Sequence, residues 1–168
     1  MKKIVIFLIF LFVSLISFSS MDIPLKVGDK VPDFKYYTLE GKELNSKDLL
    51  GKKILLNFSS TWCPQCIKEK EKLNKEYSSI IKNDSNLNFL IFFGPYGRRI
   101  ERRDTAEVAK NYMTSKNYIF PSYFDKNREV IEIFGVKSIP TSFLIDEKGI
   151  IVEINNEYYK TLNLPTTK

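Results

Sequence analysis

The fold is decided by the stretch Ile54-Leu55-Leu56-Asn57-Phe58 and, four residues later, Trp62-Cys63-Pro64-Gln65-Cys66. The apolar run of residues 54–58 is typical of a strand buried on both faces of a sheet. Apolar residues then recur at helical spacing and predict a helix from Pro64 to about Lys82; they are Ile67, Leu73, Tyr77, Ile80 and Ile81. A buried strand therefore turns into a helix at a pair of cysteines.

The two cysteines have the spacing of a reactive dithiol. Cys63 is expected at the start of the helix, where free backbone N–H groups and the helix dipole stabilise a thiolate. Pro64 suits the first helical position, because its missing N–H is not needed there. Cys66 lies one turn further on, close enough for an intrachain disulfide. The pattern predicts that Cys63 attacks a partner disulfide and that Cys66 resolves the mixed disulfide.

Two other interpretations of the cysteine pair remain open. An inert disulfide would close a loop of only about four residues, which constrains the unfolded chain little. Two thiolates could also hold Cu(I), as in a metal chaperone. The chain has no histidine and only these two cysteines, which excludes His-ligated metals, Cys–His pairs and a four-thiolate zinc site. We favour redox chemistry and expect no metal and no cofactor.

The rest of the chain alternates short strands and helices. Phe34–Leu39 is predicted as an edge strand, and Ser46 as the N-cap of a short helix that ends at Gly51. The other predicted strands are 87–93, 118–124 (broken by Pro121), 142–145 and 150–154, and the other predicted helices are 103–116 and 128–134. This order predicts an α/β fold, a mixed sheet with helices on both faces.

The first nineteen residues read as a signal peptide. Lys2-Lys3 precedes the apolar stretch Ile4–Ile16, and small residues allow cleavage after Ser19. The alternative is a retained membrane anchor, although the stretch is slightly short for a span of about 20 residues. We expect a linker over 20–30, one domain over 31–155 and a tail over 156–168. The domain would then be exported, to the periplasm or the outer face of the cytoplasmic membrane.

The charge pattern is mildly basic. The formal net charge is +6, which favours acidic partners or an anionic membrane face. The lysines are interleaved with Glu, so nucleic-acid binding is not expected. The segment Gly97–Arg103 holds four arginines that could dock an acidic partner or phosphate, but we favour a solvated loop and helix start.

From about Val27 to Val152, the chain resembles the thioredoxin superfamily, and within it the TlpA/ResA-like, AhpC/TSA-type redoxins. The resemblance is carried by Val27–Phe34, Gly51-Lys52, Trp62–Cys66, Phe134-Gly135-Val136, Ile139-Pro140-Thr141 and Asp146–Gly149. It implies a thioredoxin-like fold and a cis Pro140 beside the dithiol. The backbone of Ile139 would pair with the substrate, and Trp62 would also contact it.

The resemblance implies an exported thiol–disulfide oxidoreductase, expected to be a monomer. It would reduce oxidised partner proteins and be recharged by a membrane electron donor. The alternative within this class is an oxidant that installs disulfides. The peroxiredoxin pattern Pro-x-x-x-Thr-x-x-Cys is absent, so peroxidase activity is not expected.

Three positions near the dithiol need separate interpretation. Asn57 stands where cytoplasmic thioredoxins carry a buried acid. Glu69 lies three residues after Cys66, where it could accept the Cys66 proton or simply be a solvated residue of a charged helix. Lys70 falls on the predicted apolar face of the helix, where the family usually has an apolar residue.

Overall fold

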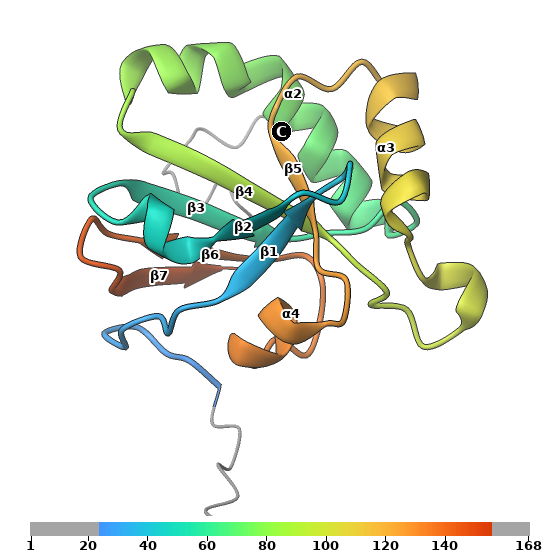
Figure 1. Ribbon diagram of the computed structural model, residues 1–168. Helices are drawn as coiled ribbons and strands as arrows, with labels where there is room; N and C mark the ends of the chain where they lie inside the picture. The colour runs from blue at the N-terminus through green and yellow to red at the C-terminus, as the bar shows by residue number, and fades with distance from the viewer. Residues whose placement is uncertain (1–23, 156–168) are drawn as a thin grey trace, which may run out of the picture.

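The protein folds around one mixed sheet. The computed structural model describes residues 24–155, so the predicted signal peptide (1–19), the start of the predicted linker and the tail (156–168) lie outside the described residues. Its seven strands follow the order β2-β1-β5-β4-β3-β6-β7, and helices cover both faces (Figure 1). The predicted thioredoxin-like α/β architecture is confirmed.

The element bounds agree closely with the sequence pattern. The strands are β1 Lys35–Thr38, β2 Glu43–Asn45, β3 Lys53–Phe58, β4 Leu87–Phe93, β5 Ser122–Phe124, β6 Thr141–Ile145 and β7 Ile151–Asn155. The helices are η1 Ser46–Leu49, α2 Pro64–Asn83, η2 Ile100–Arg102, α3 Ala106–Ser115 and α4 Glu129–Ile133, of which η1 and η2 are 3₁₀ turns. Strand β3 is central, with β4 parallel on one side and β6 antiparallel on the other.

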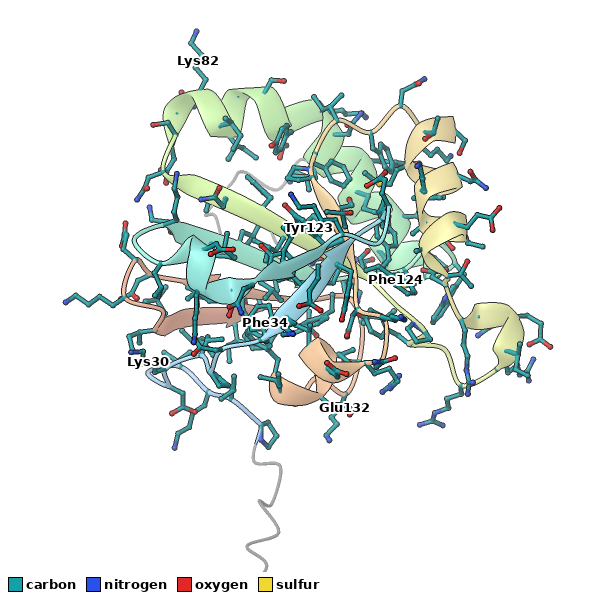
Figure 2. The ribbon with its side chains drawn as sticks, viewed as in Figure 1. Lys30, Phe34, Lys82, Tyr123, Phe124 and Glu132 are labelled. Carbon is teal, nitrogen blue, oxygen red and sulfur yellow. The ribbon has the colours of Figure 1, made fainter. Side chains whose placement is uncertain are left out.

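Each face of the sheet packs into its own hydrophobic layer. Ile54, Leu56 and Phe58 of β3 join the layer under α4, whereas Leu55 joins the layer under α2 and α3. The alternation follows from the two-residue period of a strand. Tyr123 and Phe124 of β5, labelled in Figure 2, divide between the two layers in the same way. Odd-numbered residues of β3, including Asn57, therefore face α2.

Two predictions about the N-terminal part of the domain, one for a strand and one for a helix cap, are wrong. Strand β1 is not an edge strand, because it pairs with both β2 and β5, and β2 forms the edge. Ser46 does not cap the short helix: Asn45 is the cap, and its side chain accepts from the N–H of Lys47. The Ser46 hydroxyl instead accepts from the N–H of Phe34 at 2.8 Å, which ties the start of the sheet to η1.

Two predicted boundaries are also corrected. Helix α3 begins at Ala106 and not near Arg103, because Thr105 is its N-cap and accepts from the N–H of Val108. Strand β5 is limited to three residues after Pro121, since proline supplies no N–H to a ladder.

Among residues 24–155, no helix combines the length and the apolar character needed to cross a bilayer.

Candidate active site

Cys63 lies where β3 has ended and α2 begins. It is the N-cap residue, with extended backbone angles, and Pro64 follows in the first turn. The Cys63 sulfur accepts from the backbone N–H of Cys66 at 3.4 Å, and the Cys63 N–H donates to the hydroxyl of Ser60 at 3.2 Å. A sulfur in this position receives the free N–H groups of the helix start, as a thiolate nucleophile requires.

Cys66 lies one turn deeper. Its side chain is fully buried, whereas Cys63 is 8% exposed, and both are free thiols. Burial raises the pKa of the Cys66 thiol to about 12, and the positive charge of Lys70 opposes this increase. The two thiols thus differ in environment: Cys63 is slightly exposed, and the raised pKa keeps the buried Cys66 thiol protonated at neutral pH.

The loop before β6 approaches the dithiol from the opposite side. The peptide bond between Ile139 and Pro140 is cis, in agreement with the geometry that the resemblance implies. The Cys63 thiol lies 3.9 Å from the Ile139 carbonyl oxygen, and the Thr141 hydroxyl donates to the carbonyl of Ser138 at 2.7 Å. Ile139 therefore lies next to the Cys63 sulfur.

Glu69 is buried, with 3% of its surface exposed, and is not a solvated residue of a charged helix. The amide nitrogen of Asn57 reaches the Glu69 Oε2 at 3.5 Å and donates to the hydroxyl of Ser142 at 2.7 Å. Asn57 faces α2 because of the strand alternation described above. A carboxyl group is thus held inside the protein one helical turn beyond Cys66.

Lys70 carries a buried ammonium beneath the dithiol. It is 2% exposed and donates to the Ser59 hydroxyl at 2.8 Å, the Ser60 carbonyl at 2.7 Å and the Cys66 carbonyl at 3.0 Å. Its nitrogen also lies 5.3 Å and 5.4 Å from the ring centroids of Phe93 and Tyr112, within range of a cation–π contact. Burial lowers the pKa of Lys70 to about 8.

Asp104 fixes the loop that carries the motif. It is 3% exposed and accepts from the backbone N–H and the hydroxyl of Thr61, at 2.8 Å and 2.6 Å. Burial raises the pKa of the Asp104 carboxyl, while the hydrogen bonds from Thr61 and the charge of Lys70 act in the opposite direction. This buried carboxylate holds the residues immediately before Trp62 in place.

A groove of about 450 Å³ opens at the exposed side of Cys63. Trp62, Cys63 and Ile139 contribute to its wall, together with Val136 and Ser138 of the loop before Pro140. The structure thus brings together Trp62, Cys63 and Ile139 along one concave surface. Within residues 24–155 no group of three or more Cys, Asp or Glu side chains is arranged to hold a metal ion.

The sequence match to a known family covers the same elements. A family model described as the AhpC/TSA family matches residues 27–154, which include the sheet, the dithiol and the cis-proline loop. The chain belongs to the AhpC/TSA family. Its dithiol site places it among the thioredoxin-like thiol–disulfide oxidoreductases of this family.

Individual relatives of this AhpC/TSA protein support the assignment. It is 34% identical over 129 residues to the thiol-disulfide oxidoreductase ResA of Bacillus anthracis, covering 77% of this chain and 69% of that protein. It is 30% identical over 142 residues to the thioredoxin-like protein YneN of Bacillus subtilis, covering 83% and 76%.

Solved structures agree on the fold. A thioredoxin-family thiol:disulfide interchange protein of Chlorobium tepidum superposes with a TM-score of 0.62 at 26% identity, covering 78% of this chain and 87% of the other. StoA of Bacillus subtilis has a TM-score of 0.62 at 24% identity, covering 74% and 87%.

The sequence did not anticipate two charged groups at this AhpC/TSA site. Nothing in the local sequence of Asp104 separates it from a surface residue. The sequence at Lys70 shows only a departure from the usual apolar residue. A lysine on an apolar helix face, one turn after a reactive cysteine, was the available signal that it is buried near the dithiol.

Proposed function

We propose that this protein reduces disulfide bonds in partner proteins outside the cytoplasm, with Cys63 as the attacking thiol. The observation that supports this most is the contrast between the two thiols. Cys63 lies at the groove beside Ile139 and the helix start, whereas Cys66 is fully buried behind it. A resolving thiol needs to reach only the Cys63 sulfur, so its burial is compatible with exchange.

The reaction divides into two exchanges. The Cys63 thiolate attacks one sulfur of the partner disulfide, the partner S–S bond breaks, and the partner's second sulfur leaves as a thiolate that takes a proton. The Cys66 thiolate then attacks the Cys63 sulfur and releases the partner's first sulfur. The partner gains two electrons and two protons, and the enzyme is left with a Cys63–Cys66 disulfide.

The substrate segment would lie along the loop before Pro140. The backbone of Ile139 would pair with the partner chain, and Trp62 would pack against it. A backbone contact of this kind accepts different sequences. Such a contact suits an enzyme that acts on more than one oxidised protein.

Glu69 is the proposed base for Cys66. The pKa of Cys66 is raised to about 12 by burial, so resolution needs a group that removes its proton. Glu69 is buried on the next turn of α2 and is contacted by Asn57. Its position on the same helical face supports this role.

Export and recharging complete the proposal. Lys2-Lys3 and the apolar stretch that follows support export, with the stretch either cleaved or kept as an anchor. An oxidised enzyme outside the cytoplasm must receive electrons across the membrane. A membrane dithiol donor would therefore convert the Cys63–Cys66 disulfide back to two thiols.

The reduction potential of the Cys63–Cys66 couple tests the direction. A reductant should lie near the thioredoxin end of the range, about −270 mV, and an oxidant near about −120 mV. The alternative, an enzyme that installs disulfides, is favoured by Lys70, because a buried positive charge stabilises the thiolate-bearing reduced form. Equilibration with dithiothreitol or glutathione buffers decides between them: a value near the upper end would overturn the reductant proposal.

A further inference from the structure

The groove beside Cys63 is lined by positive charge. Arg98 and Arg99 come from the segment between β4 and η2, Arg102 from η2, Arg128 from the start of α4 and Lys137 from the loop before Pro140. No Asp or Glu is among the residues that line it. Glu132 on α4 contacts one of these cations, with its Oε1 3.3 Å from the Arg128 Nε. The other cations share the lining of the groove with Cys63.

The distribution of arginine makes this arrangement distinctive. The chain has 26 Lys and Arg residues, and only five are arginine. Four of these five line the groove, namely Arg98, Arg99, Arg102 and Arg128, and the fifth, Arg103, donates to the carbonyl of Gly97 in the groove wall. Every other cationic side chain of the protein is a lysine. Arginine binds carboxylates through two parallel hydrogen bonds, which lysine does not.

The arginine segment is folded into a defined shape. A Cβ at Gly97 would lie 1.8 Å from the Arg102 carbonyl oxygen, so only glycine fits where the chain folds back. The Arg102 guanidinium lies 5.7 Å from the centre of the Trp62 ring, and Arg128 donates to the carbonyl of Pro95 at 3.3 Å. These contacts hold Arg102 against Trp62 and Arg128 against the loop after β4, while the arginine side chains of residues 98–102 stay exposed and accessible to a partner.

We propose that this groove recognises an acidic segment next to the target disulfide of an oxidised partner protein. Asp or Glu side chains of the partner would contact Arg98, Arg99 and Arg102 while its cysteine sulfur meets Cys63. This inference rests on the proposed reductase function and adds the substrate class. Positive charge along the groove speeds the encounter with an acidic partner. The paired hydrogen bonds of each guanidinium group then hold the partner's carboxylates in place.

Three synthetic peptides with one intramolecular disulfide test the proposal. They share the cysteine core and differ only in the flanking residues, which are all Glu, all Gln or all Lys. Reduced enzyme is mixed with each at low salt, and the second-order rate of peptide reduction is measured. We expect the Glu peptide to react about tenfold faster than the Gln peptide and the Lys peptide to react more slowly than both, with the differences shrinking as salt is added.

Matched variants locate the effect. The double variant Arg98→Gln/Arg99→Gln should lower the Glu-to-Gln rate ratio at least severalfold. Arg98→Lys/Arg99→Lys keeps the positive charge but loses the paired hydrogen bonds of the guanidinium groups, and should give an intermediate ratio. Lys82→Gln/Lys148→Gln removes two exposed charges elsewhere (Lys82 is labelled in Figure 2) and should leave the ratio unchanged.

The outcomes separate the inference from the function on which it rests. Equal rates for all three peptides would overturn the acidic-substrate inference and leave the reductase function intact, whereas failure to reduce any peptide would overturn both. Glutathione disulfide reduced as fast as the Glu peptide would replace the inference with a small anionic substrate. An Arg98→Gln/Arg99→Gln variant that loses binding to phosphatidylglycerol vesicles but keeps its peptide preference would assign the arginines to a lipid surface.

Discussion

Replacing Lys70 with Met tests the buried ammonium beneath the dithiol. The Lys70 nitrogen donates to Ser59, Ser60 and Cys66 and is closed off from solvent by aromatic rings. The Lys70→Met variant keeps a similar side-chain volume but carries no charge. Met also removes these three hydrogen bonds, so the pH dependence of the difference between wild type and variant, and not its absolute size, reports the titration of the ammonium.

The expected pH dependence has a definite sign. Burial lowers the pKa of Lys70 from 10.5 to about 8, so between these pH values the unfolded chain binds more protons than the folded one. The unfolding free energy of the wild type must then rise with pH relative to Lys70→Met. This shift in the pKa of Lys70 corresponds to about 3 kcal/mol of unfolding free energy. About 2 kcal/mol of it should be regained by the wild type between about pH 7 and about pH 9.5.

Urea unfolding at a series of pH values measures this difference. Both proteins are studied in the oxidised form, so that Cys66 does not titrate, and Lys116→Met provides a control in which an exposed lysine is removed from the end of α3. The unfolding free energy of the wild type minus that of Lys70→Met should increase as pH rises. A gap that stays constant, or that moves no more than the control, would refute the account of Lys70 as a destabilised buried ammonium.

Two further substitutions test buried carboxyl groups. Glu69→Gln should slow the second exchange, in which Cys66 attacks, without slowing the first; single-turnover kinetics across pH separates the two steps, and an unchanged second step would exclude Glu69 as the base. Asp125→Ala should lower the unfolding free energy by about 2–4 kcal/mol, because Asp125 accepts from the N–H groups of Val130 and Ile131 at the start of α4 and from the Tyr96 hydroxyl. A urea midpoint equal to that of the wild type would show that this cap contributes nothing.

Local pattern accounts for most of the fold. The largely apolar runs of β3 and β4 and the helical spacing after Pro64 predict their elements to within a residue. The errors fall where a local signal competes with a contact between residues distant in sequence. Ser46 has the side chain of an N-cap, but its hydroxyl bonds to Phe34, which is distant in sequence. Asn45, one residue earlier, takes the capping role.

The site was predictable only in part, for a physical reason. The dithiol and Pro140 are read from motifs in which neighbouring residues carry the signal. The groove is made by residues 62–63, 96–99, 102, 128, 131 and 136–139, which the fold brings together from four segments. The arginines do lie in a solvated loop and 3₁₀ turn, as expected, but no periodicity in the chain relates them to the other groove residues. The burial of Asp104 and Lys70 likewise depends on packing between α2, α3 and the motif loop.

The central claim is that Cys63 attacks a partner disulfide and Cys66 resolves the product. The most direct test is the fate of Cys66→Ser after mixing with a disulfide-bonded peptide. Mass spectrometry should show a stable mixed disulfide between the peptide and Cys63, because attack proceeds and resolution cannot. Cys63→Ser under the same conditions should form almost none. Equal trapping by both variants, or trapping only through Cys66, would contradict the account.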